Sequence, residues 1–183
     1  MSRAARNGVG VLLMVFAAWF VFTGANAGPQ VGGEVQVKTI KYADLVKSVR
    51  DQRGKVVVVD LWGDFCLPCK REFPHLVELH QQYADKGLVC MSVALDAPED
   101  SKAPAPPPGV LKFLTKQKAT FTNYWLNEDG KVWTDRFGIS GVPAVFVFDR
   151  QGRRAAKFTQ DDGKTFDYTD VRKLVEKLLA PAS

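Results

Sequence analysis

Stretches of apolar residues alternate with amphipathic stretches along most of this chain, and that alternation predicts a sheet packed against helices. Two near-continuous apolar runs, Val56 to Leu61 and Leu88 to Leu95, are typical of central strands that are covered on both faces. The segment from Leu67 to Gly87 lies between them and carries apolar residues at helical spacing. A strand, a helix and a second strand in this order predict parallel strands joined by a helical crossover.

The remaining segments complete an α/β domain. Before the first buried strand, Glu34 to Thr39 is expected to form an edge strand and Tyr42 to Arg50 a helix. After the second buried strand, the predicted elements are a helix over Val110 to Lys118, a strand over Tyr124 to Leu126, helical turns over Val132 to Phe137, a hairpin of Ala144 to Phe148 with Arg154 to Phe158, and a closing helix over Val171 to Leu179. We therefore expect a central mixed sheet with helices on both faces.

The first 27 residues have the features of an export signal. Arg3 and Arg6 precede an uncharged apolar run over residues 9–22, and Ala25-Asn26-Ala27 fits a small-residue cleavage site. The run is short for a membrane span, which needs about 20 apolar residues, so an uncleaved membrane tether is the alternative to a cleaved signal. Residues 28–183 then form one domain in a periplasmic or other extracytoplasmic location, where disulfides persist.

The charge of the chain does not favour nucleic acid as a partner. The formal charge is +5, but Arg3 and Arg6 belong to the export signal, and the remainder has 23 basic residues against 20 acidic ones. The basic residues are scattered among the acidic ones, which is typical of a solvated surface. A proline-rich insert over residues 96–109 interrupts the domain and is expected to form an extended surface loop.

The candidate chemistry lies where the first buried strand meets the following helix. Cys66 and Cys69 are three positions apart, so one helical turn places both thiols on one face, within the separation that a disulfide tolerates. Cys66 starts the helix, where unpaired N–H groups and the helix dipole favour the thiolate that attacks disulfides. Pro68 lies in the first turn, where its missing N–H costs little. These residues indicate a redox site.

Two segments, VVVVDLWGDFCLPCKREFPHL and RFGISGVPAVFVFDRQGR, are similar to the thioredoxin fold. More narrowly, the chain resembles the exported thiol–disulfide oxidoreductases of the TlpA/ResA-like group, from roughly Val35 to Leu179. The resemblance implies a thioredoxin-like fold and an enzyme that cycles between a dithiol and a disulfide. By this likeness Cys66 is the exposed nucleophile and Cys69 is the resolving thiol.

The resemblance also implies roles for residues around the cysteine pair. Asp60 matches the buried acid of the central strand, and burial would raise its pKa enough for it to deprotonate the resolving thiol. The alternative for Asp60 is an ion pair with a lysine such as Lys70. Val142 and Pro143 match the loop whose cis-proline faces the cysteines, where the Val142 backbone would pair with an extended substrate.

Other residues near the pair are expected to bind substrate or to modulate the cysteines. Trp62 and Phe65 are expected to cap the site and form its rim. Leu67 and Pro68 separate the cysteines and help to set thiolate stability, and Glu72 fits the CxxCxxE pattern of the exported group.

The sequence departs from the family pattern at two places. Phe65 stands where the family usually has tryptophan, so the indole N–H donor is absent. The dipeptide Leu67-Pro68 differs from the Gly-Pro of thioredoxin, so the redox potential cannot be transferred from a relative. Potentials across this fold run from about −270 to −120 mV. A reductant is the favoured direction.

The expected partners are exported proteins that carry disulfides, together with an upstream thiol reductant, and no cofactor is expected beyond the cysteine pair. The alternative function is a copper metallochaperone of the same fold that uses Cys66 and Cys69 as ligands. Such proteins commonly take a further histidine ligand from the loop that Val142 and Pro143 occupy. His75 and His80 lie elsewhere, and neither is expected to bind a metal.

The sequence also bears on a peroxidase function and on the third cysteine. A peroxidase is disfavoured, because a peroxidatic cysteine is typically set in a threonine-containing loop and the run before Cys66 has no threonine. Cys90 is flanked by Val89 and Met91 in a predicted strand, so we expect it to be a buried, inert thiol.

Overall fold

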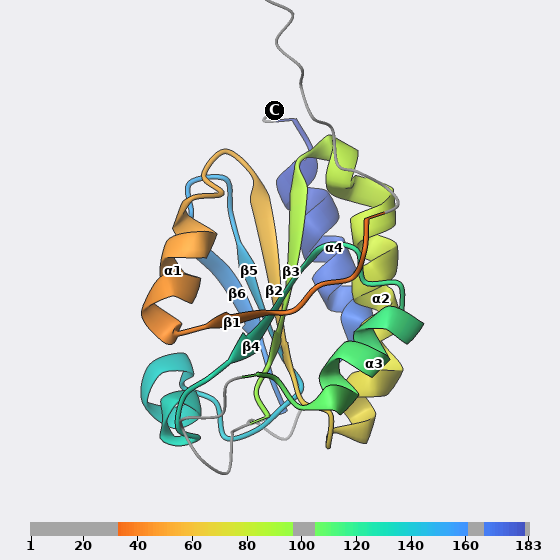
Figure 1. The fold of residues 1–183 in the computed structure, drawn as a ribbon. Helices are drawn as coiled ribbons and strands as arrows, with labels where there is room; N and C mark the ends of the chain where they lie inside the picture. Colours follow the sequence, from red (N-terminus) through yellow and green to blue (C-terminus); the bar gives the residue numbers. More distant parts are fainter. Residues whose placement is uncertain (1–32, 97–104, 161–166, 182–183) are drawn as a thin grey trace, which may run out of the picture.

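Six strands form one mixed sheet in the computed structural model, which describes residues 33–96, 105–160 and 167–181 (Figure 1). The strands are β1 (Lys38–Ile40), β2 (Val56–Trp62), β3 (Leu88–Ala94), β4 (Thr122–Leu126), β5 (Ala144–Phe148) and β6 (Arg154–Phe158). The helices are α1 (Tyr42–Arg50), α2 (Leu67–Tyr83), α3 (Pro108–Lys116) and α4 (Tyr168–Leu179), with a short 3-10 helix η1 (Ala84–Lys86) and a π-helical turn η2 (Trp133–Phe137). The predicted α/β class with a mixed sheet is confirmed.

The sheet order is β1-β4-β3-β2-β5-β6, which places β2 in the centre. Strand β2 runs parallel to β3 and antiparallel to β5, and all seven of its residues are buried. Side chains alternate between the two faces of a strand. Val58 and Trp62 therefore lie in one core and Val57 and Val59 in the other, and Asp60 points to the same face as Val58.

Helices cover both faces of the sheet, as predicted. In Figure 1, α1 lies on one face, and α2, α3 and α4 lie on the other. The core beneath α2 and α4 includes both cysteines of the pair, Phe73, Val171 and Val175. The second core lies between the sheet and α1 with η2. The two cysteines thus lie on the α2 side of the sheet.

The bounds of some elements differ from the sequence prediction, and local capping explains two of the differences. Helix α3 begins at Pro108, because proline is tolerated in the first turn of a helix. Helix α4 begins at Tyr168, because the Asp167 side chain caps it by accepting a hydrogen bond of 2.7 Å from the Thr169 N–H. Strand β1 begins only at Lys38, later than predicted. Helix α2 continues through Pro74.

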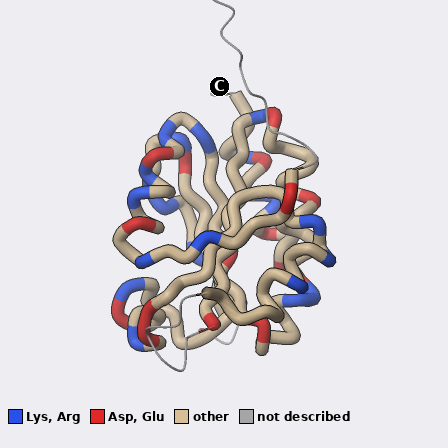
Figure 2. The backbone as a smooth tube through the Cα atoms, in the orientation of Figure 1, with Lys and Arg blue, Asp and Glu red and all other residues tan. Residues whose placement is uncertain are grey.

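The predicted export signal over residues 1–27 and residues 97–104 of the proline-rich insert lie outside the described residues. Within the described ranges, no helix has the length and apolar character needed to cross a bilayer. Positions of Lys and Arg are interspersed with those of Asp and Glu along the backbone drawn in Figure 2, in agreement with the scattered charges of the sequence.

Candidate functional site

A disulfide joins Cys66 and Cys69 at the N-terminal end of α2, with a Cα–Cα distance of 5.3 Å. Cys66 is the N-cap residue of this helix, and its Sγ accepts a hydrogen bond of 3.2 Å from the Cys69 N–H. A thiolate formed at Cys66 therefore has a hydrogen-bond donor and the positive end of the helix dipole beside it. The local sequence creates this arrangement, since Pro68 occupies the first turn without loss of a helical hydrogen bond.

Cys66 is less accessible than the sequence comparison implied. Cys66 is 6% exposed and Cys69 is 2% exposed. The cysteine that was expected to be an exposed nucleophile is therefore buried in the disulfide state. The apolar side chains on either side are the exposed ones, Phe65 at 63% and Leu67 at 73%. A docking protein would therefore meet these two side chains before it reached the sulfur.

The loop before β5 covers the disulfide on one side. The Val142–Pro143 peptide bond is cis, and the Val142 carbonyl oxygen lies 3.7 Å from Cys66 Sγ. Pro143 is buried and Val142 is half-buried. The structure thus brings the predicted loop against the predicted nucleophile across 76 residues of sequence.

Trp62 does not form the rim of the site, contrary to the sequence prediction. Its side chain is fully buried, with ring centroids 4.9 Å from Phe113 and 5.5 Å from Phe73. As the last residue of β2, it points into the core beneath α2 and α3. Its Nε1 has no hydrogen-bond partner within the part of the chain that the structure describes. Trp62 therefore supports the site from below and cannot touch a docked partner.

Phe65 forms the exposed rim with a residue that the sequence analysis did not select. Its ring stacks on Trp133 of η2, with centroids 6.3 Å apart and an interplanar angle of 9°. Gly63 allows this position, because a Cβ atom there would lie only 2.5 Å from the Phe65 ring. No local signal links Phe65 to Trp133, since 68 residues separate them in the chain.

The short loop that leads into Cys66 is held from three sides. The Asp64 N–H donates to both carboxylate oxygens of Asp96, at 2.9 and 3.0 Å, and the Asp64 carboxylate pairs with Lys70 at 2.6 Å. At the start of α3, Gly109 fits against Asp64 so closely that a Cβ atom would lie 2.0 Å from Oδ2. These contacts fix the position of the loop that leads into Cys66. Strands β2 and β3 are parallel, so their carboxyl ends lie at the same edge of the sheet. Asp64 and Asp96 each follow the end of one of these strands, and this position is the signal in the sequence that could have linked Asp96 to the site.

Asp60 is buried and bonded to a residue far away in sequence. The Tyr168 hydroxyl of α4 donates a hydrogen bond of 2.6 Å to Asp60 Oδ2. Lys70 pairs with Asp64 instead, so the alternative ion pair of Asp60 with Lys70 is wrong. Tyr168 belongs to the same buried cluster as Cys69, which places the carboxyl group on the cysteine side of the sheet.

Burial raises the pKa of Asp60 to about 7. The Tyr168 hydrogen bond acts in the opposite direction and lowers this pKa, whereas the nearby charge of Glu72 raises it. Burial also raises the pKa of the free Cys90 thiol well above its ordinary range, and the charge of Asp60 adds to this effect. A carboxyl group that titrates near neutrality suits proton transfer, and the Cys90 thiol stays protonated.

Replacement of Tyr168 with phenylalanine should raise the pKa of Asp60, because the hydrogen bond that favours the carboxylate is lost. We expect any step that depends on ionised Asp60 to move to higher pH. The pH dependence of insulin reduction by the Tyr168→Phe variant measures this shift. An unchanged pH profile would contradict the assignment, and Tyr83→Phe is a matched control, since the Tyr83 hydroxyl bonds to exposed Glu176.

Glu72 and the two histidines lie on α2. Glu72 is half-buried and lies 4.0 Å from His75 Nε2, and His75 Nδ1 lies 3.5 Å from Glu78. Burial lowers the pKa of His80, whose ring packs against Phe121 with centroids 5.3 Å apart. Among the described residues, no group of three or more His, Cys, Asp or Glu side chains is arranged to hold a metal ion.

Comparison with known proteins supports the resemblance inferred from sequence. The chain is 30% identical to the thiol-disulfide oxidoreductase ResA of Bacillus thuringiensis subsp. konkukian over 105 residues, which cover 57% of this chain and 55% of that protein. The chain thus spans just over half the length of the curated relatives it matches.

Solved structures of similar proteins share the fold. One is the thioredoxin domain of a thiol-disulfide oxidoreductase from Bacteroides vulgatus, with a TM-score of 0.53, 27% identity and coverage of 68% of this chain and 82% of that one. Another is a Chlorobium tepidum protein provisionally named thiol:disulfide interchange protein DsbE, with a TM-score of 0.52, 28% identity and coverage of 71% and 84%. The predicted thioredoxin-like fold is confirmed. Residues 34–173 match the AhpC/TSA family, and because this match spans more than half of the chain, the protein belongs to that family.

Proposed function

We propose that this protein is a thiol–disulfide oxidoreductase that reduces disulfides in partner proteins. The observation that carries the proposal is the closed Cys66–Cys69 disulfide at the N-terminus of α2, against the Val142 carbonyl. The name of the ResA relative and the shared fold support the same activity.

The proposed cycle begins with the reduced pair. The Cys66 thiolate attacks one sulfur of a partner disulfide, forms a mixed disulfide and releases the first partner thiolate. Asp60 then takes the proton from the Cys69 thiol, and the Cys69 thiolate attacks Cys66 Sγ. The second partner thiolate leaves, two electrons have passed to the partner, and the Cys66–Cys69 disulfide is restored. An upstream thiol reductant returns the pair to the dithiol.

The exposed rim suits a protein substrate. Phe65, Leu67 and the half-buried Trp133 offer apolar surface beside Cys66, and the Val142 backbone lies on the other side of the sulfur. An extended partner segment would lie between them, with its disulfide over Cys66. Pro143 and Trp62 would support this surface from below, and Leu67, Pro68 and Glu72 would modulate the reactivity of the pair.

We also propose that the protein acts outside the cytoplasm. Residues 1–27 carry a basic start, an apolar run and a small-residue cleavage site. Residues 28–183 would then work where partner disulfides persist, either released or tethered through residues 9–22.

Covalent trapping tests the proposed reduction. In the Cys69→Ser variant the mixed disulfide on Cys66 has no resolving thiol, so we expect partner proteins to remain attached to Cys66 after purification from the extracytoplasmic fraction. Dithiothreitol should release them, and denaturing gels without and with reductant measure the difference. The Cys66→Ser variant is the matched control and should trap none. Equal trapping by both variants, or none by either, would argue against the cycle.

A further inference from the structure

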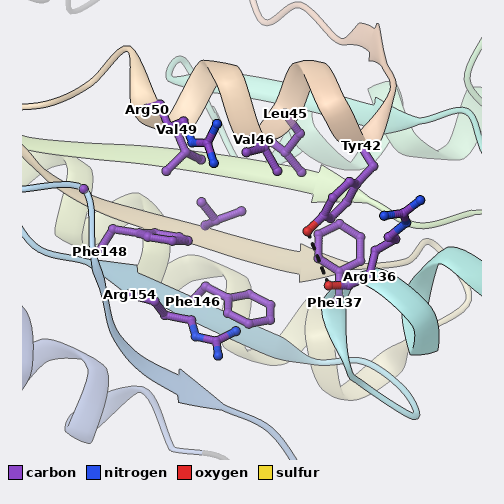
Figure 3. A pocket seen from close by; sticks show the side chains of 12 residues that line it. Tyr42, Leu45, Val46, Val49, Arg50, Arg136, Phe137, Phe146, Phe148 and Arg154 are labelled. Carbon is purple, nitrogen blue, oxygen red and sulfur yellow. Dashed lines mark hydrogen bonds between the residues drawn. The ribbon is translucent and has the colours of Figure 1, made fainter.

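A cavity of about 360 Å³ lies between α1 and the sheet, on the face opposite the cysteine pair. Figure 3 shows apolar side chains of α1 on one side of this space and Phe146 and Phe148 of β5 on the other. Tyr42 and Phe137 close one end. Since redox catalysis takes place on the α2 face, the proposed cycle makes no use of this cavity.

The charge around the cavity has one sign. Twelve residues line it, of which three are arginines, Arg50, Arg136 and Arg154, and none is acidic. Arg136 lies over the Tyr42 ring at 5.9 Å and Arg154 over the Phe146 ring at 5.7 Å. Within residues 33–96, 105–160 and 167–181, none of the three arginines forms an ion pair.

We propose that this cavity binds a small amphiphilic carboxylate, with its acyl chain in the apolar space and its carboxylate against Arg136 or Arg154, which lie over the aromatic rings of the lining. The planar guanidinium group matches a carboxylate with two parallel hydrogen bonds. The volume is near the lower end of the range for small-molecule sites, about 300–1,000 Å³, which suits one acyl chain. An anionic head is favoured over an uncharged one because three exposed guanidinium groups and no carboxylate line the cavity.

Titration with decanoate, followed by amide resonances in a ¹H–¹⁵N spectrum, tests the site. We expect the amides of Val46 and Gly152, which line the cavity, to shift, and that of Leu67 beside the cysteines to stay. Decan-1-ol has the same chain without the charge and should bind at least about tenfold more weakly, which corresponds to one lost charged hydrogen bond.

Substitutions test separately where the carboxylate and the acyl chain of the ligand bind. At least one of Arg136→Gln and Arg154→Gln should weaken decanoate binding about tenfold and leave decan-1-ol binding unchanged, whereas Lys116→Gln on exposed α3 surface should change neither. Val46→Trp fills the cavity and should abolish binding of both ligands. Ala43→Trp, on an exposed position of the same helix, is its control.

Three results would overturn the proposal: no shift of the cavity amides, equal affinity for decanoate and decan-1-ol, or binding that persists in Val46→Trp. If Val46→Trp does not fold, the arginine variants and the map of shifted amides still decide. Insulin reduction is independent of these readouts, so failure of the carboxylate site leaves the proposed redox function standing, and the reverse also holds.

Discussion

The Cys66→Ser variant should lose insulin reduction almost completely, by at least about a thousandfold, because no other thiol can start the exchange. A serine hydroxyl is not a nucleophile toward a disulfide at neutral pH, and Cys69 is only 2% exposed. A thousandfold loss corresponds to about 4 kcal/mol of activation free energy. The turbidity of reduced insulin in the presence of dithiothreitol measures the rate.

Cys90 provides the matched control for this loss. Its thiol is buried in β3, and burial holds its pKa well above the ordinary range. Cys90→Ala should therefore keep wild-type insulin reduction, and alkylation of the reduced protein should modify Cys66 first and Cys90 last. Residual activity in Cys66→Ser that disappears on further removal of Cys90 would show that the wrong thiol has been assigned.

Replacement of Asp60 with asparagine should remove one pH dependence of stability. The folded-state pKa of Asp60 is about 7, whereas an unfolded aspartate titrates near 3.9. Between these values the folded chain holds a proton that the unfolded chain has released, so the contribution of Asp60 to stability falls as pH rises. A shift of about three pKa units corresponds to an effect on the order of 4 kcal/mol. Asparagine resembles the neutral acid and lacks this titration.

Denaturant unfolding of the oxidised protein at pH 5 and pH 8 measures the effect. We expect Asp60→Asn to gain stability relative to wild type as pH rises between these values. Asp44→Asn, at an exposed position on α1, is the control and should follow wild type. Parallel pH dependence in wild type and Asp60→Asn would exclude a raised pKa at this carboxyl group.

The same substitution should slow the second step of the proposed cycle. Without a base for the Cys69 thiol, the mixed disulfide on Cys66 should persist, with a loss of about 10²–10⁴ in the resolving rate. If the variant gains stability at pH 8 but resolves the mixed disulfide at the wild-type rate, the raised pKa of Asp60 would be a consequence of burial alone. In that case Asp60 would be a buried acid without a role in proton transfer.

The position of the cysteine pair and most of the secondary structure follow from local patterns. Each of these patterns involves residues that are close together in the chain. They are the valine run of β2, the three-residue spacing of Cys66 and Cys69, and the proline in the first turn of α2. Such patterns set which residues form strands and helices and which thiols lie one turn apart. The spacing of the two cysteines therefore already permitted a disulfide.

Contacts between distant segments depended on the order of the strands, which no local pattern contains. The bond between Tyr168 and Asp60 joins residues 108 positions apart, and Val142 meets Cys66 across 76. The burial of Trp62 was missed for the same reason, because α3 packs over the end of β2 only in three dimensions. The sequence by itself determined that two thiols would lie one turn apart at a helix start, close enough to form a disulfide. Only the tertiary structure decided which groups surround that pair, since these groups come from helices and loops that the sheet topology brings together.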